Sequence, residues 1–250
     1  MQVLPREDGR KVDEPRTISI TPKYTMHAQG SVFVEVGNTK VICTAFIEDG
    51  VPHFMRGTKS GWLTAEYGML PGSTATRKKR PGQGKTDGRA QEIQRLIGRS
   101  LRAIIDLSKI GERTIWIDCD VTQADGGTRT ASITGAFVAL VFAVRHLYEN
   151  KKIKHIPITQ QLAAISVGVV NDRTLLDLQY TEDRDAEVDM NVVMLDDQSL
   201  IEVQGTAEGK PFSREQFNLM MDYAEKGLKP YFDAQKAALG GYLIKPADSQ

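Results

Sequence analysis

The sequence predicts an α+β protein. Segments of alternating or β-branched apolar residues open the chain and recur in its second half, which is typical of strands. Residues 91–106 and 130–148 instead carry apolar residues at helical spacing. The resulting order is strands, helix, strand, helix, strands, helix, which favours α+β over other classes.

The first half is expected to contain a small sheet and two helices. A turn at Gly37-Asn38 is typical of a hairpin between two of its strands. Residues 53–88 are rich in Gly, Pro, Lys and Arg and are expected to be mostly loop, with one candidate strand at 61–65. The remaining elements are expected as strands at 16–21, 31–36, 40–47 and 114–121, an amphipathic helix at 91–106 and a largely buried helix at 130–148.

The second half is expected to add four strands and a helix. Pro230 is expected to separate that helix from a helical tail ending near residue 239, because proline interrupts helices. The expected elements are strands at 163–170, 174–180, 190–195 and 200–204, and a helix at about 213–226.

The composition restricts the class of protein. The 250 residues include 32 Lys plus Arg and 32 Asp plus Glu, so a nucleic-acid partner would need a local basic patch. Cys43 and Cys119 lie in apolar, β-branched stretches and are expected to be buried and free. The polar N-terminus does not resemble a secretory signal, and no continuous apolar run reaches the roughly 18 residues of a membrane span. We therefore expect a cytoplasmic protein without a membrane partner.

A glycine turn between an expected strand and helix is a candidate anion site. It contains Gly126, Gly127, Thr128 and Arg129. Glycine permits close backbone approach, a helix start presents free N–H groups, and an arginine offers donors matched to phosphate oxygens. The alternative is a plain turn in which Asp125 or Thr128 caps the helix.

An acidic stretch follows in the second half. Crowded carboxylates can hold Mg²⁺, and one of them can keep a raised pKa and donate a proton. The alternative is a solvated acidic loop. The stretch contains Asp177, Glu182, Asp183, Asp185, Glu187 and Asp189.

A basic stretch lies in the glycine-rich loop. Lysine and arginine with few acids nearby suit a phosphate backbone, although a solvated loop is the simpler interpretation. Together, an anion site, an acidic site and a basic loop suggest phosphoryl chemistry on a polyanion. The basic residues are Arg77, Lys78, Lys79, Arg80, Lys85 and Arg89.

Several long motifs resemble the bacterial ribonuclease PH family, from about Arg10 to Lys226. The resemblance implies an α+β, ribonuclease PH-type fold with two βαβα-like halves in one compact domain. The halves would span about 10–150 and 160–226, followed by a helical tail at 227–250. The motifs are WLTAEYGMLP at 62–71, EIQRLIGR at 92–99, QADGGTRTA at 123–131, DMNVV at 189–193 and IEVQGTAEG at 201–209.

The same resemblance implies an activity. Members of the family are 3′-to-5′ exoribonucleases in which inorganic phosphate, as co-substrate, releases nucleoside 5′-diphosphates from precursor tRNA and other RNA. The reverse reaction adds nucleotides. It further implies Mg²⁺ as cofactor and a homo-hexamer built as a trimer of dimers.

The site residues follow by position from the resemblance. It implies phosphate binding by Arg89, Gly127, Thr128 and Arg129, catalysis and Mg²⁺ binding by Asp183 and Asp189, and RNA guidance by Arg77 and Arg80. Two positions depart from the family pattern. Gly72 replaces an arginine that often follows Met-Leu-Pro, and Asp87 stands near the phosphate arginine, where it would repel the anion unless it points away.

Three other functions compete with phosphorolysis. A non-catalytic RNA-binding ring subunit is expected to lack the phosphate arginine or the acidic pair, and both are present. A hydrolytic metal nuclease would release monophosphates without phosphate. A small-molecule phosphotransferase would leave the basic loop unexplained.

Overall fold

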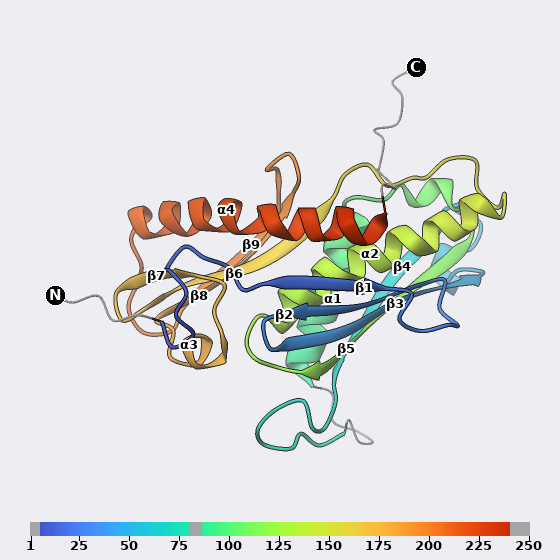
Figure 1. The fold of residues 1–250 in the computed structure, drawn as a ribbon. Coiled ribbons are helices and arrows are strands. Elements are labelled where there is room, and N and C mark those ends of the chain that lie inside the picture. The colour runs from blue at the N-terminus through green and yellow to red at the C-terminus, as the bar shows by residue number, and fades with distance from the viewer. Residues whose placement is uncertain (1–5, 81–86, 241–250) are drawn as a thin grey trace.

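The computed structural model describes residues 6–80 and 87–240, which form two sheets and four α-helices (Figure 1). The first half contains β1 (Ile18–Pro22), β2 (Gly30–Val36), β3 (Thr39–Asp49), β4 (Trp62–Met69), α1 (Gly88–Arg102), β5 (Arg113–Gln123) and α2 (Thr128–Glu149), with short 3-10 helices at His53–Met55 and Leu107–Lys109. The second half contains β6 (Leu162–Val170), β7 (Arg173–Leu176), α3 (Tyr180–Arg184), β8 (Val188–Leu195), β9 (Leu200–Ala207) and α4 (Arg214–Leu239). The α+β class is confirmed.

The first sheet has the order β1-β2-β3-β5-β4. Adjacent strands in this sheet are antiparallel, except for β4 and β5. These two strands are parallel and are connected through α1. Alternate residues of β3, such as Val41, Cys43 and Ala45, are fully buried, because side chains of a strand point to opposite faces. The run β4-α1-β5-α2 thus has the expected βαβα order and places the end of β5 and the start of α2 side by side.

The second sheet has the order β7-β6-β8-β9 and is antiparallel throughout. It contains the variant order β7-α3-β8-β9-α4, in which one extra strand precedes the last helix. Every residue of β6 is buried, because β6 lies between β7 and β8 and packs against both α2 and α4. In Figure 1, α4 runs along both halves of the molecule.

Helix α2 forms the centre of the protein. It packs against β2 and β3 of one sheet and β6 of the other, so Phe137 and Leu140 are fully buried. Buried residues of both sheets belong to one hydrophobic cluster around it. Of the helices in the described ranges, only α2 is long and apolar enough to span a membrane by length and composition, although it contains no continuous apolar run of that length. However, 83% of that window is buried inside the protein.

Most expected strands are present, with ends shifted by a few residues. The candidate strand at 61–65 is the start of β4. Cys43 and Cys119 are buried and free, as predicted. The expected strand at 174–180 is wrong in its second half, because β7 ends at Leu176 and Asp177 has a positive φ of 54°. The chain turns there and enters α3, which the sequence did not indicate.

The first expected helix is displaced towards the N-terminus. Asp87 caps α1 at its start through bonds from the backbone N–H groups of Arg89 and Ala90. The helix ends at Arg102, although the apolar pattern continues through Ile104 and Ile105. These two residues are buried in the segment that follows, where Ile105 pairs with Ile158 in an isolated bridge.

The expected break at Pro230 is wrong, because α4 continues through it to Leu239. Pro230 is exposed, so water can satisfy the carbonyl group that loses its helical donor. Leu228 and Tyr231 on either side are buried, and their packing maintains the helix across the proline.

Candidate functional site between the two halves

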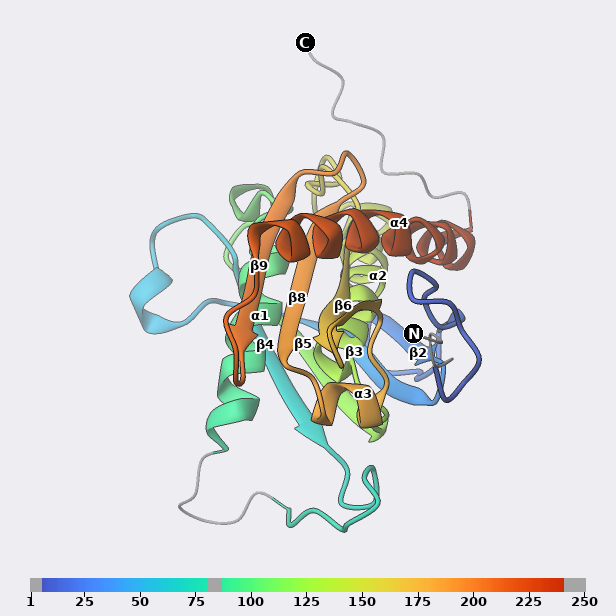
Figure 2. The ribbon, with the colours of Figure 1, turned by 90° about the vertical axis from the view of Figure 1, so that its left-hand side faces the viewer.

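A cleft of about 540 Å³ lies where the two halves meet. It is bounded by the end of β4, the loop that follows, and the starts of α1 and α2 on one side. On the other side are β6, α3 and the start of β8. In Figure 2, the arrowhead of β4 and helix α3 lie at the same lower end of the molecule. The lining residues are Met69, Thr74–Lys78, Arg89, Ala124–Arg129, Ser166, Tyr180, Asp183, Asp189 and Asn191.

The glycine turn has the geometry of an anion cradle. Gly126 and Gly127 have φ values of +72° and +62°, which other residues rarely adopt. A Cβ atom on Gly126 would also clash with the backbone carbonyl of Leu178. Gly127 is the N-cap of α2, and no side chain caps the helix, so the alternative in which Asp125 or Thr128 is the cap is wrong. The helix therefore presents its positive end to the cleft.

The turn is held from behind by two side chains. The hydroxyl of Thr39 donates to the carbonyl of Gly126 at 2.6 Å and accepts from the backbone N–H of Asp125 at 3.0 Å. The guanidinium of Arg16 donates to the carbonyl of Asp125 at 2.5 Å. These contacts occupy the turn's backbone on the side away from the cleft.

Arg129 is directed by a neutral partner. Its Nη1 lies 3.4 Å from the amide oxygen of Gln204 on β9, and the amide nitrogen of Gln204 donates to Glu92 on α1 at 2.7 Å. Among the residues that the structure describes, no carboxylate forms a salt bridge with Arg129 or with Arg89 at the start of α1. Both positive charges are therefore available to an anion in the cleft.

Tyr67 on β4 supports the hydroxyl of Thr128. The two oxygens are 2.8 Å apart, and Tyr67 is buried. Burial raises the pKa of the Tyr67 phenol, although Arg89 and Arg129 act in the opposite direction. Tyr67 therefore remains protonated near neutral pH and can fix the orientation of the Thr128 hydroxyl.

Asp183 on α3 and Asp189 on β8 face the arginines across the cleft. Burial raises the pKa of Asp183, and the charges of Arg89 and Arg129 only partly oppose that effect. Burial also raises the pKa of Asp189, and the charge of Asp183 raises it further. Asn191, two residues along the same face of β8, also lines the cleft. One of these acids can hold a proton at a higher pH than a solvated carboxyl.

The other acids of the same stretch do not join this pair. Asp177 is paired with Arg16, Glu182 with Arg6, and Asp185 is exposed and paired with the adjacent arginine. Within residues 6–80 and 87–240, no group of three or more Asp, Glu, His or Cys is placed to hold a metal ion. The acids of this stretch therefore do not form one group, and Asp183 and Asp189 are the two of them that line the cleft.

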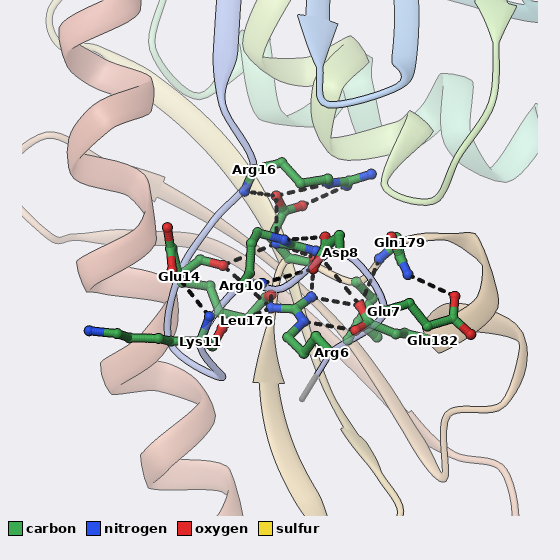
Figure 3. Close-up of polar contacts among 12 residues, drawn as sticks. Arg6, Glu7, Asp8, Arg10, Lys11, Glu14, Arg16, Leu176, Gln179 and Glu182 are labelled. Atoms are coloured by element: carbon green, nitrogen blue, oxygen red, sulfur yellow. Dashed lines mark hydrogen bonds and ion pairs between the residues drawn. The ribbon is translucent and has the colours of Figure 1, made fainter. Parts of the chain in front are cut away.

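The N-terminal segment braces α3 from outside the cleft (Figure 3). Arg6 donates to both oxygens of Glu182, at 2.8 and 2.6 Å, and to the carbonyl of Leu176 at 2.8 Å. Glu182 in turn accepts from the backbone N–H of Gln179, which completes a capping box for α3. This five-residue helix, which carries Asp183, is thus fixed by a contact with a distant part of the chain.

The basic loop reaches the cleft only in part. Arg77 and Lys78 line it, whereas Arg80 is exposed and lies outside the lining. Lys85 falls outside the described residues. Asp87 caps α1 and is not among the residues that line the cleft, which is the arrangement expected if its carboxylate points away from the anion.

Sequence reasoning missed several supporting residues. Tyr67 and Gln204 lie within motifs quoted above, yet nothing local indicates that they contact Thr128 and Arg129. Asn191 had a signal, because it stands two residues after Asp189 and must share its face of a strand. Arg16 and Asp177 are 161 residues apart, and only the fold brings them together.

Comparison with known proteins agrees with this architecture. The model of the 3′ exoribonuclease family, domain 1, matches residues 14–145, and the model for domain 2 of the same family matches residues 160–227. The crystal structure of rice (Oryza sativa) Rrp46 has a TM-score of 0.73 and 20% identity, covering 94% of this chain and 98% of that one. An Archaeoglobus fulgidus exosome with RNA bound to the active site has a TM-score of 0.74 and 21% identity, covering 93% and 91%. An archaeal exosome core has a TM-score of 0.72 and 19% identity, covering 94% and 91%. At these identities the structures establish a shared fold.

Proposed function

Because this chain belongs to the 3′ exoribonuclease family, we propose that it shortens RNA by phosphorolysis, as a bacterial-type ribonuclease PH. Its main substrate would be the 3′ trailer of precursor tRNA in the cytoplasm. The observation that carries the proposal is one cleft that contains two arginines and two acids. Arg89 and Arg129 form no salt bridge with any carboxylate of residues 6–80 and 87–240, and they face Asp183 and Asp189, whose pKa values are raised.

The anion cradle would hold the attacking phosphate. Arg89 and Arg129 would bind its oxygens, and the N–H groups at the start of α2 would add neutral donors. Tyr67 would keep the Thr128 hydroxyl turned towards the same anion. These groups would position the phosphate for attack and stabilise the charge that develops, which are the main contributions a protein makes to phosphoryl transfer.

The reaction exchanges one bond for another. An oxygen of orthophosphate attacks the phosphorus of the last internucleotide link, and the bond from that phosphorus to the 3′ oxygen of the penultimate nucleotide breaks. The terminal nucleotide leaves as a nucleoside 5′-diphosphate, and the 3′ oxygen takes up a proton. Asp183 or Asp189 would supply that proton, because the raised pKa of each favours its protonated form.

The acidic pair also suits a magnesium ion. Burial and mutual repulsion disfavour two negative charges here, and a divalent cation would remove that penalty. Mg²⁺ commonly uses one or two carboxylates and takes its remaining ligands from water and phosphate. The absence of a third acid among the described residues is therefore compatible with it. Bound there, it would neutralise charge on the scissile phosphoryl group.

We also propose a homo-hexamer, arranged as a trimer of dimers, as the active form. The fold shared with exosome subunits supports a ring. A ring would gather the Arg77- and Arg80-bearing loops of several subunits around one RNA, which compensates for a net charge of zero. Sedimentation of the purified protein would measure the number of subunits.

The decisive experiment incubates 3′-labelled precursor tRNA with the protein and Mg²⁺, with and without inorganic phosphate. If the reaction is phosphorolysis, nucleoside diphosphate is released when phosphate is present, and no nucleotide is released when it is absent. Monophosphate released without phosphate would instead identify a hydrolase acting through Asp183 and Asp189. Binding of RNA without any product would identify a binding subunit.

A further inference from the structure

Tyr180 is an exposed aromatic side chain inside a polar cleft. It is 53% exposed. Among the described residues of the chain, it is the only aromatic one that lines the cleft. A single exposed aromatic residue is common on protein surfaces and carries no argument by itself. Its position beside the anion turn and the acidic pair makes it informative.

The backbone of Tyr180 is fixed from two sides. Its N–H donates to the Asp125 carboxylate at 3.3 Å, which ties it to the anion turn. It is also the first residue of α3, which the capping box of Gln179 and Glu182 closes and Arg6 braces (Figure 3). Within the described part of the chain, no side chain hydrogen-bonds its hydroxyl and no ring stacks on it. The ring thus extends from a fixed backbone and is about half exposed to solvent.

The cleft is larger than its anion site requires. At about 540 Å³ it falls within the roughly 300–1,000 Å³ of sites that bind small organic molecules. The glycine turn accounts for a phosphate, and Asp183 and Asp189 account for the reacting phosphoryl group. A nucleotide has one further part, its flat base, and Tyr180 lies on the same short helix as Asp183, three residues before it.

We propose that Tyr180 is the stacking platform for the base of the RNA 3′-terminal nucleotide, an inference that rests on the proposed function. Stacking on an aromatic ring is nearly independent of base identity, because every base has a π face. An exonuclease that removes successive nucleotides needs this tolerance. The site therefore takes a 3′-terminal ribonucleotide with any base.

The test measures RNA affinity without phosphate, so that no turnover occurs. The probe is a short single-stranded RNA with 2-aminopurine at its 3′ end, compared with the same RNA carrying an abasic 3′ nucleotide. The variants are Tyr180→Ala and Tyr180→Phe. The matched control is Tyr148→Ala, at the end of α2, where the tyrosine is similarly exposed but lies outside the cleft.

Loss of stacking is expected to raise the Kd of Tyr180→Ala for the normal RNA about tenfold, while Tyr180→Phe and Tyr148→Ala bind like the original protein. For the abasic RNA, Tyr180→Ala and the original protein are expected to bind equally. Fluorescence of the terminal 2-aminopurine should be quenched by the original protein and by Tyr180→Phe, but not by Tyr180→Ala.

If Tyr180→Ala loses the same affinity for the normal RNA and for the abasic RNA, the proposal is overturned. A structural or electrostatic role of Tyr180 would not depend on the presence of the base. Unchanged affinity of Tyr180→Ala for the normal RNA would overturn it as well. The outcome is separable from the proposed reaction. Base-dependent binding without diphosphate release would support the platform and reject phosphorolysis, whereas diphosphate release with no dependence on Tyr180 would do the reverse.

Discussion

The carboxylate of Asp177 accepts three hydrogen bonds from Arg16: from the backbone N at 2.7 Å, from Nε at 3.0 Å and from Nη2 at 2.6 Å. Both side chains are buried. Burial alone would raise the pKa of Asp177, but the charge and hydrogen bonds of Arg16 outweigh it and lower that pKa. The pair joins the segment before β1 to the end of β7 and stands directly behind the anion turn.

We expect Asp177→Asn to lower the free energy of unfolding by about 3–5 kcal/mol at pH 7, because it leaves the Arg16 charge buried without its partner. Asparagine keeps the size of the side chain and tolerates the positive φ at this position. Because the pKa of Asp177 is lowered in the folded state, the pair stabilises the protein above the unfolded pKa near 4 and loses this effect as pH falls through the folded pKa. Urea unfolding should show the difference at pH 7 and a smaller one in acid; equal stability at pH 7 would contradict it.

Arg129→Ala should reduce kcat/KM for phosphorolysis by about 10²–10³-fold or more, because it removes a charged donor that we propose binds the attacking phosphate. The fold should be unaffected, since the side chain of Arg129 makes only one hydrogen bond to the part of the chain that the structure describes, the 3.4 Å contact with Gln204. Initial rates at varied phosphate concentration and thermal unfolding measure the two effects. Arg56→Ala, at an exposed arginine outside the cleft, is the control, and near-normal activity of Arg129→Ala would remove the anion cradle from the mechanism.

Gln204→Glu tests whether the neutral partner of Arg129 matters. A carboxylate at this position would pair with the guanidinium and compete with phosphate, so the KM for phosphate should rise about tenfold or more, whereas the affinity for RNA should change little. Gln204→Leu provides the control for loss of the contact without added charge. If the KM for phosphate rises as much in Gln204→Leu as in Gln204→Glu, Gln204 acts by holding Arg129 in position and not by leaving its charge unpaired.

Asp189→Asn is expected to abolish activity and yet stabilise the fold by roughly 1 kcal/mol at pH 7. Burial and the charge of Asp183 raise the pKa of Asp189 in the folded protein. Protonation of Asp189 therefore stabilises the original protein fully below the unfolded pKa, and this stabilisation is lost as the pH rises through the folded pKa. The gain in the variant should therefore shrink as the pH is lowered towards 4. Chemical unfolding at both pH values measures it, and a destabilised variant at pH 7 would show that Asp189 is needed for the fold.

Gly72→Arg restores the charge that often follows Met-Leu-Pro in the family. A side chain fits there, because an added Cβ atom would meet nothing within 4 Å. The Kd for RNA should fall several-fold, and its salt dependence should steepen by about 0.7 in log Kd per log salt. Gly72→Gln, which adds length without charge, should leave both unchanged; the same tightening in both variants would exclude an electrostatic cause.

Local patterns predicted those parts of the fold that depend on local physics. The alternation in β3 and the apolar run of α2 directly report burial, so their positions were nearly right. The glycine turn was recognisable because Gly127 and Arg129 are only two positions apart in the sequence. The resemblance to a known family added Asp183, Asp189 and Arg89, which the cleft brings together.

The parts that could not be predicted depend on contacts between distant residues. Helix α3 has only five residues and is held by Arg6, about 175 positions earlier in the chain, so no periodicity marks it. The sequence left open whether the acidic stretch is a site or a solvated loop, because it does not show that Asp177 and Glu182 are paired with Arg16 and Arg6. Pro230 was misjudged because its exposure, and the packing of Tyr231 beside it, are tertiary properties.

The cleft takes its anion turn from one half of the chain and its acids from the other, with residues 150–161 as the link between α2 and β6. Each half therefore holds an incomplete set of chemical groups. Cutting the chain within this link would give two polypeptides that are inert alone and regain activity only when they reassociate. Fused to two other proteins, the halves would act as a complementation reporter, in which diphosphate release registers that the two fusion partners have met.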